Sequence, residues 1–285
     1  MRCCGTMRFW RGFGRGGERG RGREWRVGAR PALLALYGIV LLKALTLARP
    51  GAKPPTRTQK ELEMSLFGLG LYTVSQSSQL TGIPTASVRR WMGGYVQKGV
   101  TYSPLWLPEV DLDELVISFR DLMELRSVYA LKKEGISVQT IRKAIAAAVA
   151  LIGVDRPLST SRFRTDGRKI FLQIEPADDN EAQLIEVFTR QINFKSIVEQ
   201  SLKDVVFDGI FPAAWRPAGG RAGIIVDPLR NFGHPIDEVS GVSTQSLYES
   251  YAAEGSIERV AQIYEVPKQV VKRAVAFQGG LAKAA

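Results

Sequence analysis

The sequence is poor in the residues on which many enzymes and disulfide-stabilised domains depend. Its 285 residues include one histidine, His234, and two cysteines, Cys3 and Cys4. A disulfide framework and a cysteine metal site are therefore excluded from residues 64–285. A Ser-His-Asp or Cys-His apparatus would have to use His234 or not exist. We expect no enzyme activity, no cofactor and no metal site.

Long hydrophobic runs are also scarce. The apolar run Ala32 to Leu42 is interrupted by Lys43 before it reaches the roughly 18 residues that indicate a membrane span. The run also makes a poor signal peptide. The basic region before it, of some 30 residues, is too long, and the sequence where cleavage would occur, ARPGAKPPTR, is unusual. We expect a cytoplasmic, nucleoid-associated protein with no membrane partner, and export or anchoring is the lesser alternative.

The excess of positive charge belongs to the first part of the chain. Residues 1–63 hold 14 Lys and Arg against 4 Asp and Glu, whereas residues 64–285 hold 25 against 24. We hypothesise that translation begins at Met64 and that residues 1–63 are a disordered or non-native leader. The alternative is that its Arg-Gly tract binds RNA.

Residues 72–95 predict two short helices joined by a tight turn. Ser75 is expected to cap the first helix, which runs to about Leu80, and Gly82 ends it. Pro84 and Thr85 open the second helix. Helical spacing predicts a buried side of Val88, Trp91 and Met92, with Ser87, Arg89 and Arg90 on other faces. This is the geometry that a DNA-reading helix-turn-helix needs.

The middle of the chain predicts two amphipathic helices and a hairpin. The first helix is expected from an Asp111 cap to Gly135, with Asp121 and Glu124 on its polar side, and the second from Ser137 to Gly153. Such helices bury the back of the first motif or pair with another subunit. The Asp166-Gly167 turn predicts a β hairpin, and residues 175–183 predict an acidic loop that holds no metal.

The last part of the chain predicts a strand, a joint and three more helices. Residues 207–220 read as strand and turn that end in a flexible joint at Gly219-Gly220. Beyond it, helices are expected to begin at a Thr244 cap, at a Ser256 cap and at Pro267. Their apolar residues have the spacing of a trihelical core, and this spacing leaves Lys268, Gln269, Lys272 and Arg273 exposed on the last helix.

Two stretches resemble known families. The segments Tyr72–Val74, Leu80–Ile83 and Ser87–Trp91 resemble the helix-turn-helix of MerR-like regulators, with residues 94–110 in the place of a wing. This resemblance implies DNA contacts by Ser87, Arg89 and Arg90.

Residues 224–277 resemble a small helix-turn-helix domain of VapB-like antitoxins. The matching residues are I-V-D-P at Ile225–Pro228, F-G-H-P at Phe232–Pro235 and the stretch Ala252–Tyr264. The chain departs from that pattern at Gly241, where an arginine often stands, so a contact made through that arginine cannot be carried over. His234 lies in the F-G-H-P turn, and we expect it to be structural.

These observations predict a mainly α-helical protein with a small β hairpin and two helix-turn-helix domains joined by a helical and hairpin middle. The expected divisions are 1–63, 64–154, 155–220 and 221–285. The resemblance implies an antitoxin, a homodimer, that binds operator DNA, represses its own operon and neutralises a PIN-like ribonuclease toxin. The alternative is an interaction adaptor or regulator without a toxin. Candidate DNA-binding residues are Ser87, Arg89, Arg90, Lys268, Gln269 and Lys272, and candidate toxin contacts are Arg216, Arg221 and Arg273.

Overall fold

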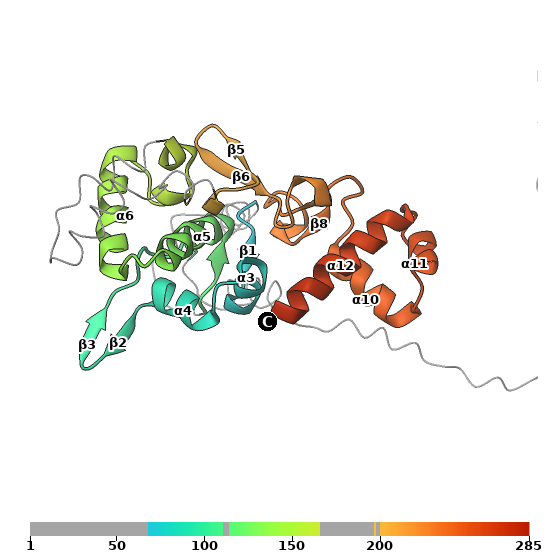
Figure 1. Ribbon diagram of the computed structural model, residues 1–285, viewed down its shortest axis with the longest axis horizontal. Coiled ribbons are helices and arrows are strands. Elements are labelled where there is room, and N and C mark those ends of the chain that lie inside the picture. Colours follow the sequence, from blue (N-terminus) through green and yellow to red (C-terminus); the bar gives the residue numbers. More distant parts are fainter. Residues whose placement is uncertain (1–67, 111–113, 166–196, 198–199, 285) are drawn as a thin grey trace, which may run out of the picture. The chain divides into compact units, whose positions relative to one another are not determined.

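A computed structural model describes residues 68–110, 114–165, 197 and 200–284, all within the unit Arg57–Ala285 (Figure 1). The leader, the Asp111 cap, the Asp166-Gly167 hairpin and the acidic loop 175–183 lie outside the described residues.

The described part of the chain is mainly α-helical and carries four small antiparallel sheets of two strands each, as predicted in class. None of its helices is long and apolar enough to cross a membrane. The helices are α3 (Val74–Thr81), α4 (Thr85–Gly93), α5 (Phe119–Lys133), α6 (Val138–Ile152), α10 (Thr244–Glu254), α11 (Ile257–Ile263) and α12 (Lys268–Ala284). The paired strands are β1 (Leu71–Tyr72) with β4 (Ile117–Ser118), β2 (Tyr95–Gln97) with β3 (Val100–Tyr102), β5 (Val205–Asp208) with β6 (Phe211–Trp215), and β7 (Ile224–Ile225) with β8 (Ile236–Asp237).

Helix α5 runs through the main hydrophobic core but begins later than predicted. The prediction of a helix from Asp111 is wrong over residues 114–118, because this stretch is extended and ends in β4. Ser118 caps α5, and the capping box that it forms with Asp121 satisfies backbone groups at both positions. The core around α5 takes buried side chains from α3, α4 and α6, and also Trp215 and Val226.

Helix α6 confirms the prediction at both ends. The Ser137 hydroxyl accepts a hydrogen bond from the Thr140 amide, and Gly153 ends the helix in the left-handed conformation.

Residues 205–226 form a folded connection instead of a loose joint. Val205–Asp208 and Phe211–Trp215 pair as a hairpin, so the predicted strand is present and its partner strand was missed. Trp215 then exchanges backbone hydrogen bonds of 2.9 and 2.8 Å with Val226 on the far side of Gly219-Gly220. The Arg126 guanidinium from α5 lies 4.2 Å from the centre of the Trp215 ring. The domain boundary at residue 220 stays a prediction, and it lies inside this hydrogen-bonded segment.

Helices α10, α11 and α12 form a second core, with the residues that the sequence predicted. Ser256 caps α11, as expected, whereas α10 is capped by Ser243, and Thr244 instead donates its hydroxyl to the Pro235 carbonyl. All ten predicted apolar residues line this core. Six are buried, namely Leu247, Val260, Ala261, Val270, Val271 and Ala274, and four are partly buried, namely Tyr251, Ile257, Tyr264 and Val275.

The F-G-H-P turn packs against strand β1. The Tyr72 hydroxyl, in β1, donates a 2.7 Å hydrogen bond to the Gly233 carbonyl, and the His234 ring meets the Tyr72 ring edge-on at 6.1 Å. A Cβ on Gly233 would lie 2.5 Å from the Tyr72 hydroxyl, so only glycine fits there. Burial raises the pKa of Tyr72 and lowers the pKa of His234. This turn therefore joins residues 161 positions apart in sequence.

Candidate nucleic-acid interface

The corner between α3 and α4 is fixed by local hydrogen bonds and one buried side chain. Thr73, and not the predicted Ser75, caps α3 through a capping box with Gln76. Gly82 ends α3 with a φ of 71°, which costs glycine little. The Ile83 side chain is fully buried, and the Ser78 hydroxyl donates a 2.6 Å bond to the Ile83 carbonyl. These contacts fix the direction in which α4 leaves the turn.

Helix α4 has the two faces that the sequence predicted. Val88, Trp91 and Met92 are buried against the core, and Arg89 and Arg90 are exposed. Ser87 is half-buried, between the two faces. The outer face of α4 is thus basic.

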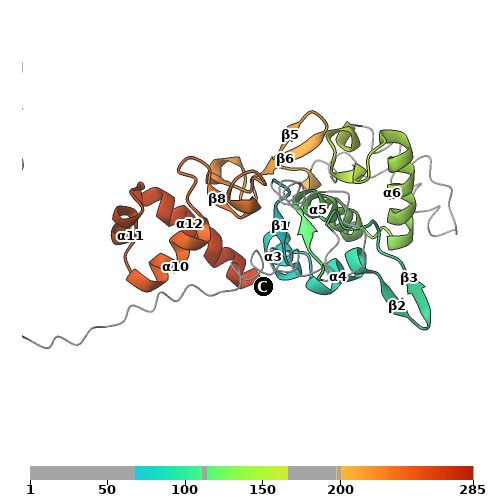
Figure 2. The same ribbon diagram turned by 180° about the vertical axis from the view of Figure 1, so that it is seen from behind.

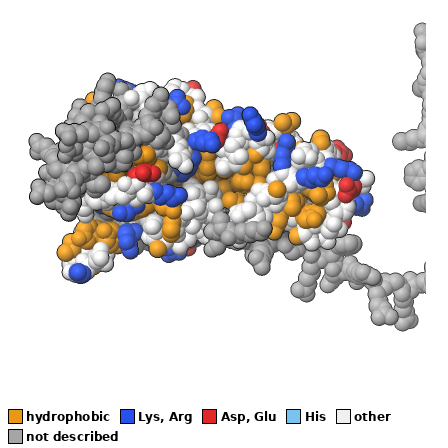
Figure 3. Space-filling model, viewed as in Figure 1, with side chains coloured by type: hydrophobic (Ala, Val, Ile, Leu, Met, Phe, Trp, Pro, Cys, Tyr) orange, Lys and Arg blue, Asp and Glu red, His pale blue; other side chains and the backbone are white. Residues whose placement is uncertain are grey.

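The β2–β3 hairpin follows α4 directly and stands where a wing was expected (Figures 1 and 2). Lys98 and Gly99 make its turn, both with positive φ, at 49° and 75°. The Tyr95 and Tyr102 rings stack at 4.7 Å, and the Arg90 guanidinium lies 5.0 Å from the Tyr95 ring centre. Figure 3 shows hydrophobic side chains along this hairpin and a basic tip; Val96 is 70% and Val100 52% exposed.

This region also has a charge property that the sequence reasoning missed. Residues 64–108 contain no Asp or Glu, although residues 64–285 as a whole are nearly neutral. The balanced charge of the whole region 64–285 conceals this local excess, which is evident only over a shorter stretch of sequence. Arg89, Arg90 and Lys98 therefore act on their surroundings without an acidic neighbour in the local sequence.

The second candidate set lies at the start of α12, in a more acidic setting. Lys268, Gln269 and Lys272 are exposed, as predicted. The Lys268 ammonium lies 3.0 Å from a Glu258 carboxylate oxygen of α11, and its hydrogen bond lowers the pKa of Glu258. Both side chains are 59% exposed, so this ion pair contributes little to stability.

The three candidate toxin contacts lie in different environments. Arg273 was predicted to be exposed, but it is half-buried and forms an ion pair with the fully buried Asp237. Arg216 forms an ion pair of 2.6 Å with Glu238. Arg221 is exposed, and no hydrogen bond or ion pair holds its side chain to the described residues. At Gly241, the Arg230 guanidinium lies 3.1 Å from where a Cβ would stand.

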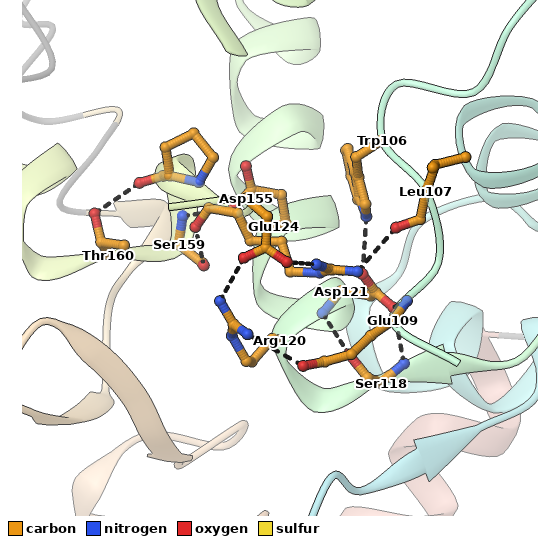
Figure 4. A network of polar contacts seen from close by, with 12 residues as sticks. Trp106, Leu107, Glu109, Ser118, Arg120, Asp121, Glu124, Asp155, Ser159 and Thr160 are labelled. Atoms are coloured by element: carbon orange, nitrogen blue, oxygen red, sulfur yellow. Dashed lines mark hydrogen bonds and ion pairs between the residues drawn. The ribbon is translucent and has the colours of Figure 1, made fainter. Parts of the chain in front are cut away.

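A buried polar network supports the loop that follows the hairpin (Figure 4). The prediction that Asp121 and Glu124 face solvent is wrong, because both are fully buried. Asp121 accepts 2.8 and 2.6 Å bonds from the Trp106 indole and from Arg156. Glu124 accepts backbone bonds of 3.0 and 2.7 Å from Leu158 and Ser159, while burial raises its pKa to about 8. Helical periodicity missed the burial of these acids because the Trp106 indole, Arg156 and the Leu158 and Ser159 amides lie 15 to 35 residues away from them in sequence.

Within the described ranges, no group of three or more His, Cys, Asp or Glu side chains is placed to hold a metal ion. The arrangement offers a basic helix face and a hairpin, which suit a ligand of repeated negative charge.

The chain is similar to a curated protein and to a solved structure. No protein-family model matches the chain. The chain is 25% identical over 232 residues to a Mycobacterium tuberculosis protein named "Putative antitoxin VapB45", covering 76% of this chain and 96% of that protein. The fold is similar to the crystal structure of Rv2018 from the same organism, with a TM-score of 0.54, 20% identity and coverage of 72% and 96% of the two chains.

Proposed function

We propose that this chain is a DNA-binding antitoxin: it represses its own operon and neutralises a PIN-like ribonuclease toxin. The antitoxin part is supported by the relative named as one, which matches over nearly its full length. The DNA-binding part is supported by one observation, the exposed basic face of α4 beside a basic-tipped hairpin in a stretch without acidic residues.

In this proposal α4 enters the major groove of the DNA, and the β2–β3 hairpin lies along the sugar-phosphate backbone of the DNA. Phosphate contacts supply most of the affinity of DNA-binding proteins, and contacts to base edges supply the specificity. Arg89 is free to reach a base or a phosphate, and Ser87 lies at the edge of the same face. Arg90 stacks on Tyr95, which holds its guanidinium at the junction of helix and hairpin.

A homodimer is part of the proposal because one copy offers few cations. Arg89, Arg90 and Lys98 give three positive charges in the α4 and hairpin region, and two copies double that number on a two-fold site. Lys268, Gln269 and Lys272 form the second DNA candidate, which the ion pair to Glu258 makes less favourable.

Toxin binding is assigned to the segment that carries the three candidate arginines. A PIN-like toxin, as the resemblance implies, presents a cluster of carboxylates, and an arginine fork suits carboxylate geometry. Arg216 and Arg273 already have acidic partners in the same chain, so Arg221 is the proposed contact. Arg216 or Arg273 would have to exchange partners to take part.

A gel-shift experiment tests the DNA-binding half. A labelled duplex from the region upstream of the protein's own reading frame should bind more tightly than an unrelated duplex, and log K should fall linearly with log salt. Equal affinity for both duplexes would mean that the protein recognises no operator in the upstream region. The interaction adaptor would then be the better interpretation.

A further inference from the structure

The loop Ser103–Glu109, which we call the hairpin base, connects the β2–β3 hairpin to the rest of the protein. Its first contact is with α4, because the Leu105 amide donates a 2.8 Å hydrogen bond to the Trp91 carbonyl. Leu105 and Trp106 are buried, so these two side chains anchor the base in the main core. The hairpin that it carries has strands of three residues and an exposed tip. A two-stranded ribbon of this size is not stable by itself, so its position depends on its base.

A single arginine from another helix grips the start of this base. Arg142, on α6, donates through one terminal nitrogen to the Pro104 carbonyl and through the other to the Ser103 carbonyl, both at 2.7 Å. Its neighbour Ile141 is fully buried, and α6 is capped at both ends. The helix therefore holds the Arg142 guanidinium in a defined position. The two carbonyls belong to the residues directly after β3.

The other end of the base is held by a second arginine. Arg156 donates 2.9 Å to the Leu107 carbonyl and 2.6 Å to Asp121, which also accepts the 2.8 Å bond from the Trp106 indole (Figure 4). Arg156 is 3% and Asp121 0% exposed, so this end is locked inside the core. Arg142 is only half-buried, and its removal does not leave an unpaired charge in the core.

On its other side, the hairpin is joined to α4 through a glycine that packs closely against β3. Gly94, between α4 and β2, has a φ of 74°, and a Cβ there would lie 2.6 Å from the Tyr102 carbonyl. A glycine restricts the backbone less than other residues do, so the direction of the hairpin depends on the contacts of its base. We propose that Arg142 is a positioning residue for nucleic-acid binding: it fixes the hairpin relative to α4, so that Lys98 and Arg89 meet the DNA together. This inference rests on the proposed DNA-binding function.

The chemistry of the contact requires arginine. The planar guanidinium has donors at a fixed spacing and satisfies two adjacent carbonyls at once, whereas the lysine ammonium is a point charge on a flexible stem. Arg142→Lys therefore keeps the charge and loses the fork. Because the guanidinium faces backbone carbonyls, it makes no phosphate contact of its own.

Binding of the upstream duplex tests the proposal in the full chain. We expect Arg142→Lys to weaken binding about tenfold, equivalent to about 1.4 kcal/mol. The slope of log K against log salt should stay unchanged, because the loosened hairpin still brings Lys98 to the DNA but must first be ordered. Arg89→Ala should reduce that slope by about 1. Lys132→Arg, which keeps an exposed charge on α5, is the matched control for the charge-conserving Arg142→Lys, and it should bind like the wild type. Wild-type affinity in Arg142→Lys, or a slope reduced as in Arg89→Ala, would refute the positioning role.

Amide hydrogen exchange separates failure of this inference from failure of the proposed function, because it needs no DNA. In Arg142→Lys, exchange at Val96–Val100 should accelerate while exchange in α5 stays as in the wild type, which also shows that the variant is folded. Unchanged exchange at the hairpin means that Arg142 does not hold it, and the inference is then wrong whether or not DNA binds. A different outcome is that the wild-type chain binds neither duplex while Arg142→Lys still accelerates exchange at the hairpin. This result would refute the proposed DNA binding but not the effect of Arg142 on the hairpin.

Discussion

Arg89 and Arg90 are adjacent in sequence but meet their surroundings differently. Arg89 projects from α4 with no hydrogen bond or ion pair to the described residues, whereas Arg90 lies over the Tyr95 ring. A stacked guanidinium keeps its charge and its edge donors, so Arg90 can still meet a phosphate while it also ties the helix to the hairpin.

Substituting the two arginines separates these roles. We expect Arg89→Ala and Arg90→Ala each to weaken binding to the upstream duplex, because each removes a cation from the proposed DNA-binding face of α4. Arg90→Ala should also accelerate hydrogen exchange in the hairpin, and Arg89→Ala should not. Lys132→Ala is the matched control for charge. A double variant with wild-type affinity in a gel shift would remove α4 from the DNA interface.

Glu124 makes stability depend on pH. Its pKa is about 8 in the folded protein, chiefly through desolvation, against an ordinary value of 4.5. The folded state therefore holds a proton that the unfolded chain releases, and the free energy of unfolding falls as pH rises from about 4.5 to about 8. Glu124→Gln cannot ionise, so its unfolding free energy should lack this contribution.

Urea unfolding at pH 5.5 and pH 8 measures the effect. The wild type should lose a few kcal/mol more than Glu124→Gln between these two values, since each pKa unit corresponds to about 1.4 kcal/mol. Glu254→Gln, an exposed acid on α10, should follow the wild type. Parallel pH profiles for wild type and Glu124→Gln would place the folded-state pKa of Glu124 near its ordinary value.

At the scale of elements, local signals predicted the helices whose ends are marked by short-range chemistry. Gly82, Gly153 and Gly255 end helices as expected, and Ser137 and Ser256 cap them. The start of α5 was misplaced because Leu115 and Val116 continue an apolar pattern, while the pairing of β4 with β1 is a contact some 45 residues apart that no local pattern reveals.

The same limit applies to the candidate sites. Helical spacing placed Val88, Trp91 and Met92 in the core and left Arg89 and Arg90 outside. It could not find the ion pair of Arg273 with Asp237, the grip of Arg142 on the hairpin base, or the burial of Asp121. Each of these depends on side chains brought together by the tertiary fold.

The trihelical core of α10, α11 and α12 should fail if its centre is charged. Val260 is fully buried on α11, whereas Ile263, on the same helix, is 51% exposed. Val260→Asp puts an unpaired carboxylate in a small core and should destabilise it by about 4 kcal/mol or more, and Ile263→Asp should cost little. Circular dichroism and limited proteolysis of the full chain measure both. Equal helicity and protease resistance in the two variants would contradict this account of the core.

At the scale of the whole unit, sequence-distant segments are locked together. The Tyr72 hydroxyl binds Gly233, Trp215 pairs with Val226, and α12 contacts α3. Residues that precede the α3–α4 corner are thus in direct contact with the segment that carries the candidate toxin contacts. A partner bound near Arg221 would act on a structure that is continuous with the proposed DNA-reading helices.

The antitoxin proposal is decided by the product of the neighbouring gene. If that product is the toxin, it should arrest growth when expressed alone, and coexpression with this chain should restore growth and retain the toxin on an affinity column. Arg221→Ala should weaken retention, because losing one partner of a desolvated charge pair costs roughly 2 to 5 kcal/mol. Arg259→Ala, an exposed arginine on α11, should retain the toxin like the wild type.

Retention that is unaffected by Arg221→Ala but lost in Arg216→Ala or Arg273→Ala would mean that the internal ion pairs open on binding. A neighbour that is neither toxic nor retained would refute the antitoxin role and favour the interaction adaptor.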